Sequence, residues 1–85
     1  MDEEIKFIDY LWNNDRIGCS AYLIDLIQPI ITKNKITKKE YYFILNVLNF
    51  CNLIYRENSN DELANDIRNN TLLYYSILFN KTIDR

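Results

Sequence analysis

Apolar residues recur at helical spacing in four stretches of this chain, and short polar segments separate the stretches. In the first stretch, residues 2–13, Ile5, Ile8 and Trp12 follow one another at intervals of three and four, and Asp2 precedes them as a good N-cap. This pattern predicts a helix that ends in the turn-forming residues 13–15. Gly18 then marks the expected joint to the next helix.

The second stretch, residues 20–32, is almost wholly apolar but contains Pro29. Proline lacks a backbone N–H and clashes with the preceding helical turn, so we expect the second helix to stop near Ile27 or to kink at Pro29. The high isoleucine content of this stretch also fits a β-strand. No second candidate strand stands elsewhere in the sequence to pair with it, and we therefore favour the helix.

The third stretch, residues 38–56, is the most apolar part of the chain. Thr37 and Glu40 match a capping box at its start. A helix that is apolar on most of its circumference is buried on most of it, so the third helix is expected to be central in the fold or to lie at a subunit interface. Its few polar residues recur every three or four positions on one narrow stripe, which consists of Asn46, Asn49, Asn52 and Arg56.

The fourth stretch continues one helical phase from about residue 60 to residue 80, which predicts a single helix. Ser59 and Glu62 match a second capping box, and residues 69–71 either break the helix or form its wet side. Residues 81–85 are expected to fray. Residues 1–85 are therefore predicted to form one all-α domain, a compact bundle of about four helices with the third helix central.

The composition agrees with this fold class. One glycine and one proline in 85 residues leave little material for the tight turns of a small β-sheet domain. Ile, Asn, Lys, Tyr and Phe together account for 42 of the 85 residues. AT-rich codons encode these amino acids, so we expect an AT-rich genome, such as that of a low-GC bacterium, one of its phages or plasmids, or a large DNA virus.

The residue types present exclude most enzymatic chemistry. Histidine is absent, which removes the usual general base and the commonest transition-metal ligand. Cys19 and Cys51 lie within apolar stretches, where buried free thiols are expected rather than a disulfide. With a single glycine there is no phosphate-binding loop. We predict no catalytic residue, no cofactor and no metal site.

The charge pattern points to a cytoplasmic protein. The formal net charge of −2 gives no general attraction to nucleic acid or to an anionic membrane. No run of 18 apolar residues is present, and the acidic residues 2–4 are unlike a secretory signal. Neither a membrane nor nucleic acid is therefore an expected partner.

Two charged clusters are candidate contacts with a partner. Asp61, Glu62 and Asp66 lie at the start of the fourth helix, where acids also favour the helix dipole and where Glu62 and Asp66 share a face. Lys38 and Lys39 belong to four lysines within residues 33–39. These lysines form either a solvated loop or a contact with phosphate or an acidic partner.

Two tyrosine pairs are the remaining candidates. Adjacent helical residues point about 100° apart, so only one member of each pair fits into a core. The other member, for which we take Tyr42 and Tyr75, is expected at a boundary, either as core-edge packing or as a partner contact.

These observations favour a small non-enzymatic protein that binds a larger protein. An inhibitor of a host system encoded by a phage or virus, an immunity protein or an adaptor would need no catalytic residue. Two alternatives stay open. One is a structural or virion component that builds a homodimer or larger oligomer. The other is a helix-turn-helix DNA-binding regulator whose turn is Gly18 or residues 33–37; it is disfavoured because no helix has the basic residues of a recognition helix.

Overall fold

A computed structural model describes residues 2–84 of the chain. The first two helices, α1 (Glu3–Asn14) and α2 (Arg16–Ile31), are separated by the single residue Asp15. Asp15 ends α1 by donating its N–H to the carbonyl of Leu11, and its carboxylate accepts the N–H of Gly18 at 3.0 Å. The predicted joint at Gly18 is therefore wrong, since Gly18 lies in the first turn of α2. A side chain at this position would collide with the capping carboxylate of Asp15, which glycine avoids.

Helix α2 continues through Pro29 and ends two residues later at Ile31. The prediction that it stops near Ile27 is wrong. Leu23, Ile27 and Ile31 are all buried, so one apolar row crosses the proline without interruption. Burial of Ile31 in the core offsets the backbone hydrogen bond that Pro29 cannot donate.

The long helices α3 (Lys38–Glu57) and α4 (Glu62–Phe79) confirm the third and fourth predicted helices. The capping box at the start of α3 is complete: Glu40 donates its N–H to the Thr37 hydroxyl at 3.0 Å, and Thr37 donates its N–H to the Glu40 carboxylate at 2.9 Å. The second predicted capping box is wrong. Asp61 caps α4 in place of Ser59 and accepts the backbone N–H groups of Leu63 and Ala64.

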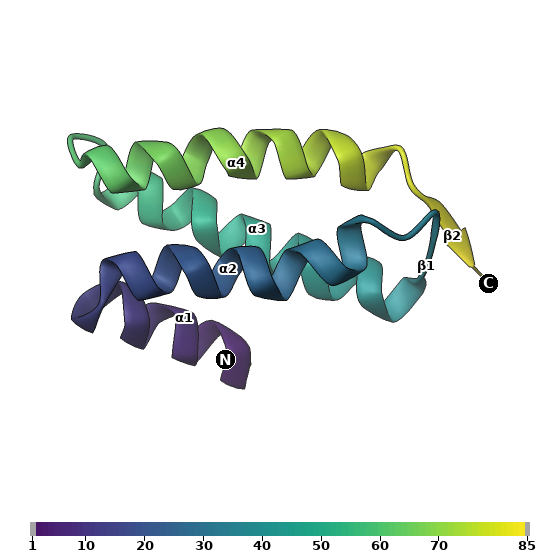
Figure 1. The fold of residues 1–85 in the computed structure, drawn as a ribbon, viewed down its shortest axis with the longest axis horizontal. Helices are drawn as coiled ribbons and strands as arrows, with labels where there is room; N and C mark the ends of the chain where they lie inside the picture. The colour runs from purple at the N-terminus through teal and green to yellow at the C-terminus, as the bar shows by residue number, and fades with distance from the viewer. Residues whose placement is uncertain (1, 85) are drawn as a thin grey trace.

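A two-stranded parallel sheet closes one end of the bundle (Figure 1). It pairs β1 (Lys35–Thr37) with β2 (Thr82–Asp84), and Ile36 lies opposite Ile83. The expectation that residues 81–85 fray is therefore wrong for 82–84, and Arg85 lies outside the described residues. Ile36 is only 1% exposed, and its burial anchors the otherwise polar segment between α2 and α3 to the core.

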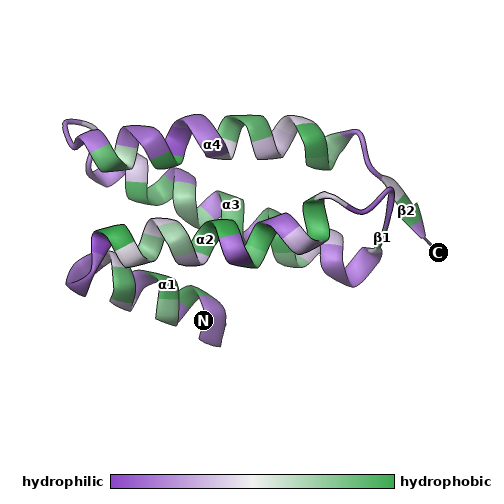
Figure 2. Cartoon of the chain, in the orientation of Figure 1, coloured by the Kyte–Doolittle hydropathy of each residue, from purple (hydrophilic) through white to green (hydrophobic). Residues whose placement is uncertain are grey.

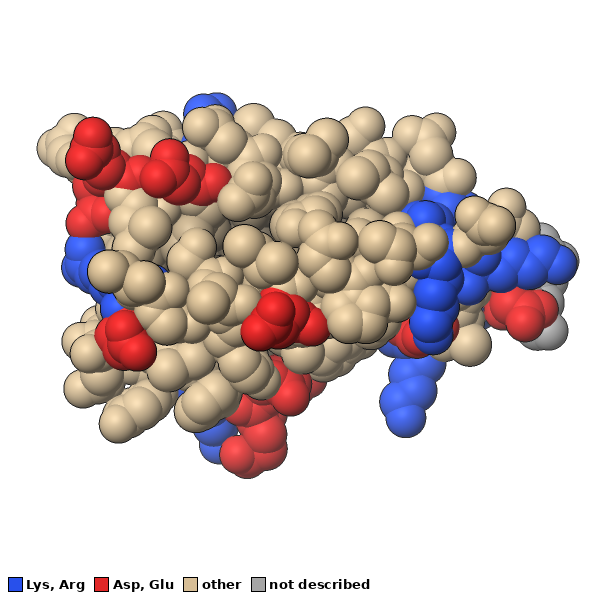
Figure 3. Space-filling view, in the orientation of Figure 1, with Lys and Arg blue, Asp and Glu red and all other residues tan. Residues whose placement is uncertain are grey.

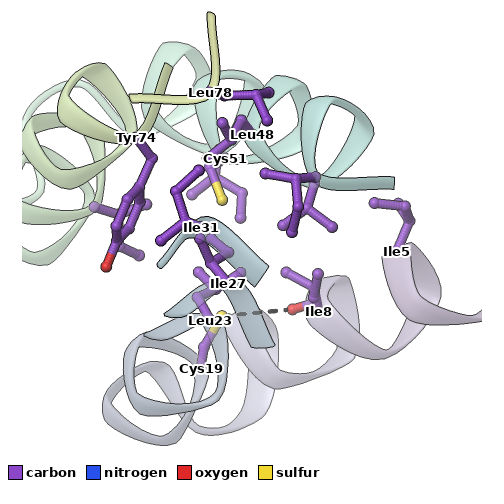
Figure 4. Packing of buried hydrophobic residues seen from close by; sticks show 14 of the residues in the cluster. Ile5, Ile8, Cys19, Leu23, Ile27, Ile31, Leu48, Cys51, Tyr74 and Leu78 are labelled. Carbon is purple, nitrogen blue, oxygen red and sulfur yellow. Dashed lines mark hydrogen bonds between the residues drawn. The ribbon is translucent and has the colours of Figure 1, made fainter. Parts of the chain in front are cut away.

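Four helices surround one core, which confirms the predicted all-α bundle. Helix α3 packs most extensively on α4, α1 packs on α2, and α2 packs on α4. Phe50 and Ile54 of α3 line a groove together with residues of α1, and Cys51 lines a cavity together with residues of α2 and α4, so α3 faces the core formed by all four helices. Figure 4 shows how the buried side chains pack in the core. The thiol of Cys19 lies against the carbonyl oxygen of Ile8. Both cysteines are free and buried, as expected.

Helix α3 is nevertheless less enclosed than its composition predicts. The polar stripe that contains Asn46, Asn49 and Arg56 faces solvent, in agreement with the sequence pattern. Tyr42 and Leu53 are also exposed. One side of the most apolar helix is thus left uncovered, and Asn46, Asn49 and Leu53 on this side lie beside Asp2 and Ile5 at the start of α1.

Candidate partner-binding surface

An uncovered surface runs along α3 and α4, and we refer to it as the α3–α4 face. Each helix contributes one row of side chains whose spacing of three, four or seven residues keeps them on the same side. The α3 row consists of Lys38, Tyr42, Asn49 and Arg56. The α4 row consists of Arg68, Leu72, Tyr75 and Phe79.

One contact joins these rows across the helix pair, and a second joins the α4 row to the neighbouring side of α3. The hydroxyl of Tyr75 donates a hydrogen bond to the amide oxygen of Asn49 at 2.5 Å. The guanidinium of Arg68 lies 4.7 Å from the ring centre of Tyr55, which is the neighbour of Arg56 on α3. The rows therefore lie side by side, and both arginines stand near the hairpin that connects α3 to α4.

Tyr75, in the middle of the face, is held in place by two neighbours. Its ring stacks on Phe79 with centroids 5.6 Å apart, and its hydroxyl is fixed by Asn49. The Tyr75 phenol is protonated at neutral pH and donates this bond, and partial burial moves its pKa further above its ordinary value. A polar handle and an aromatic surface are thus pre-organised together.

Large apolar side chains on this face are open to solvent. Tyr42 is 53% exposed, Leu72 is 50% exposed and Phe79 is 58% exposed. Figure 2 shows that the hydrophobic residues of α4 are concentrated in its second half, away from the hairpin. Other exposed apolar residues, such as Ile17 and Leu73, are not part of the face. Leu73 points about 100° away from Leu72 around α4, towards the side on which Tyr74 contacts α2.

The structure separates the seven residues predicted as partner contacts into groups. Lys38, Tyr42 and Tyr75 belong to the α3–α4 face. Lys39 is exposed but is turned about 100° away from Lys38. The acidic residues Asp61, Glu62 and Asp66 lie at the start of α4, at the opposite end of the molecule from the lysines (Figure 3).

The acidic cluster is only partly free. Asp61 caps α4 and forms an ion pair with Arg16. The hydrogen bond from the backbone of Ala64, followed by the nearby charge of Arg16, lowers the pKa of the Asp61 carboxyl. Glu62 and Asp66 are exposed and face solvent.

The lysine cluster gathers around the two strands. Lys33 forms an ion pair with Glu40 at 2.6 Å, and Lys81 donates a hydrogen bond to the carbonyl oxygen of Lys33. The pairing of β1 with β2 brings Lys81 to this end, which the sequence does not predict. Because the Thr37 hydroxyl already accepts the N–H of Glu40, the N-terminus of α3 is capped by the chain itself.

The cysteines and the other metal-ligating residue types lie apart from one another within the described residues. Burial raises the pKa of Cys19 to about 11 and that of Cys51 to about 12, which keeps both groups as thiols. Within residues 2–84, no three metal-ligating side chains come together. The described helices also include none with the length and hydropathy needed to cross a bilayer. Neither candidate turn of the helix-turn-helix alternative is a simple turn, because Gly18 lies in α2 and residues 35–37 form β1.

Comparison with known proteins gives no relative. No protein-family model matches the chain, and neither a curated protein nor a solved structure shows significant similarity to it.

Sequence reasoning missed several members of the face, namely Asn49 as an acceptor, Arg68, Leu72 and Phe79. The signal that could have found them is the spacing of residues 68, 72, 75 and 79, which forms a second row beside the buried row of Ile67, Thr71, Tyr74 and Leu78.

Proposed function

We propose that this protein acts by binding a larger protein through the α3–α4 face and performs no chemistry of its own. The observation that supports this proposal is the exposure of three large apolar side chains, Tyr42 of α3 and Leu72 and Phe79 of α4, on two helices that pack side by side. A contiguous apolar surface rimmed by polar groups is typical of a protein-binding site. The biological role that fits is an inhibitor or neutraliser of a host protein, encoded by a phage or virus and active in the cytoplasm of the host, or an immunity protein.

The energetics of such a contact are favourable. Complete burial of a large apolar side chain contributes about 1.5–3 kcal/mol, and these three are about half exposed before binding. Together they would contribute a few kcal/mol. Tyr75 is already fixed by Phe79 and Asn49, so its ordering costs little on binding. Tyrosine and arginine are also the residue types that dominate binding energy at protein interfaces.

Adjacent leucines on α4 give a matched test. The protein is tagged and used to capture partners from the lysate of its natural host, with wild type, Leu72→Glu and Leu73→Glu compared side by side. Leu72 belongs to the face, whereas Leu73 has a similar exposure of 58% but points elsewhere. We expect one stoichiometric large protein that is retained by wild type and Leu73→Glu and lost by Leu72→Glu.

The native mass of the free protein, measured beside the capture, identifies the alternative. If no large protein is captured and the chain is a dimer or larger assembly that Leu72→Glu dissociates, the α3–α4 face is a self-interface and the protein is an oligomer-building component. Equal capture by both variants would place the partner site elsewhere.

A further inference from the structure

A groove runs between α1 and α3. Helix α1 packs closely on α2 but not on α3, and it lies at one edge of the bundle (Figure 1). Two hollows occupy the space between α1 and α3, with volumes of about 390 and 330 Å³. Phe50 and Leu53 line both hollows, so the two adjoin and form one channel, which we call the α1–α3 groove.

The α1–α3 groove is long enough to seat a helix. Its α3 wall extends from Asn46 to Asn58, which corresponds to about 18 Å along the helix axis. A partner helix of about 12 residues would span the same length. Apolar side chains from both walls lie along the groove, and they are Ile5, Trp12, Phe50, Leu53 and Ile54. Leu53 is 41% exposed, so the groove leaves apolar surface open to solvent.

Carboxylates outnumber cations in the lining of this groove. Asp9, Glu57 and Asp2, which also caps α1, line it, and none of the three forms an ion pair within residues 2–84. Among the described lining residues Arg16 is the only cation, and Asp61 already pairs with it. The lining therefore presents three carboxylates that lack a cationic partner, beside an apolar floor.

The charges just outside the groove do not reverse this sign. Lys6 of α1 is paired with Glu3. The remaining charged residues near α1, Glu4 and Asp15, are acidic as well. On the part of α3 that lines the groove, the only further charge is that of Arg56. One guanidinium against the three carboxylates of the lining leaves a net charge of −2, so the groove attracts a cationic partner and repels an anionic one.

We propose that the α1–α3 groove receives a basic amphipathic helix of a partner protein. Apolar residues on one side of this helix contact Phe50 and Leu53. Lysine or arginine residues beside them pair with Asp9 of one wall and Glu57 of the other. The inference goes beyond the proposed function and does not depend on it, because the lining of the groove and the α3–α4 face have only Asn49 in common.

The chemistry of the groove selects this occupant over three others. A second copy placed groove to groove would bring carboxylates against carboxylates, and a nucleic acid would bring phosphates against them. An extended peptide would leave its own N–H groups without partners, because the walls are helices whose backbone groups are already hydrogen-bonded to one another. A helix satisfies its own backbone and presents only side chains to the groove.

The test uses Trp12 as a reporter inside the groove. It is the only tryptophan of the chain, and it lines the same hollow as Asp9 and Glu57. Three 16-residue amphipathic peptides without tryptophan share one Leu/Ile stripe and differ only in their flanking residues, which are Lys, Gln or Glu. Each peptide is titrated into the full chain at 50 and 300 mM NaCl while the emission of Trp12 is followed. We expect the Lys peptide to bind at least fivefold more tightly than the Gln peptide, the Glu peptide to bind most weakly, and the preference for Lys to shrink at the higher salt concentration.

Two pairs of variants provide matched controls. Asp9→Asn should weaken binding of the Lys peptide by at least threefold, whereas Asp25→Asn, which makes the same change on an exposed residue of α2 outside the groove, should change it by less than twofold. Leu53→Ala should weaken all three peptides by at least fivefold, whereas Leu72→Ala on the α3–α4 face should weaken none. Urea denaturation of each variant, followed by circular dichroism, checks that the fold is retained.

The outcomes separate this inference from the proposed function. If the three peptides bind equally, or if Asp9→Asn and Asp25→Asn have the same effect, the groove does not select a basic helix and the inference is wrong. If Leu72→Ala weakens binding and Leu53→Ala does not, the peptides lie on the α3–α4 face, which overturns the inference and supports the proposed function. If no peptide changes the emission of Trp12, or if the free chain is a dimer that Leu53→Ala dissociates, the inference also fails, while capture of a host protein remains an independent test of the proposed function.

Discussion

Leu48 allows the packing of α3 to be tested directly. Its side chain is 0% exposed and lies in the core with Cys51 and Leu78 (Figure 4). Truncation of a fully buried leucine to alanine removes its transfer free energy and leaves a cavity, so Leu48→Ala should lower the free energy of unfolding by about 3 kcal/mol. A domain of this length has a total stability of roughly 4–13 kcal/mol. Leu48→Asp adds an unpaired buried charge to the same loss and should leave the chain unfolded at 25 °C.

The assay is urea denaturation followed by circular dichroism at 222 nm. With a denaturant slope of about 1 kcal/mol per molar urea, Leu48→Ala should move the midpoint down by about 3 M. Leu53→Ala on the exposed side of the same helix is the control and should cost less than about 1 kcal/mol. Equal midpoints for the two alanine variants, or a Leu48→Asp variant that unfolds like wild type, would refute the buried position of this side of α3.

Three further outcomes are expected. Ile36→Ala should destabilise the domain by about 2–4 kcal/mol in the same urea assay, whereas Ile83→Ala, at the exposed position opposite, should cost less than about 1 kcal/mol; similar values would contradict the burial of β1. Cys19 and Cys51 should react with Ellman's reagent at pH 8 only when urea unfolds the protein, because burial raises the pKa of each thiol. Prompt reaction of the native protein would show instead that the cysteines are accessible. Folding lowers the pKa of the Asp61 carboxyl. The contribution of this carboxylate to stability is therefore complete above the unfolded pKa of about 3.8 and is lost as the pH falls through the lower folded pKa. Below pH 4, the free energy of unfolding should therefore fall less steeply for Asp61→Asn than for wild type.

Local signals in the sequence predicted the long helices well. The capping box of Thr37 and Glu40 predicts the start of α3 from four consecutive residues, and the structure contains both hydrogen bonds of this motif. The periodicity of residues 62–79 likewise predicts one helix, because every third or fourth apolar residue faces the same core.

Competition between local signals accounts for the errors at element ends. Ser59 and Asp61 are both acceptable N-caps, and the choice of Asp61 follows the ion pair with Arg16, which is 45 residues away in sequence. Gly18 resembles a joint in the sequence, but its function is to leave room for the cap formed by Asp15. Pro29 ends many helices, yet here the burial of Ile31 outweighs it.

The parallel strands could not be predicted from local pattern. Residues 35–37 and 82–84 are short and mostly polar, and the pairing joins segments that are more than 40 residues apart. It forms because α3 and α4 are antiparallel and similar in length, so the end of α4 returns to the start of α3. The same antiparallel arrangement brings Lys81 next to Lys33, so the lysines of residues 33–39 and Lys81 gather at this end of the bundle.

The candidate surface was predictable only in part. The reasoning that one member of each tyrosine pair must leave the core is confirmed, since Tyr74 is buried, Tyr75 is half-buried, and Tyr42 is more exposed than Tyr41. Leu72 and Phe79 were not identified, because a sequence shows that a leucine is apolar but not which side of its helix finds a neighbour. Their exposure is a property of the packing of α4.

That exposure cannot be removed by a rotation of α4. Leu72 lies about 200° around the helix from Tyr74, and Phe79 lies about 100° from Leu78, so turning either residue inward would bring a buried side chain out. A charged or polar residue at position 72 would leave the core intact and would change stability by no more than about 0.5 kcal/mol, whereas one at position 79 would also lose the stack on Tyr75, which is worth about 0.5–1.5 kcal/mol. The fold therefore does not require a large apolar side chain at position 72, whereas the proposed contact with a partner does. By the same argument, Leu72→Glu should separate the proposed binding from folding, and it is the first change with which the proposed partner can be sought.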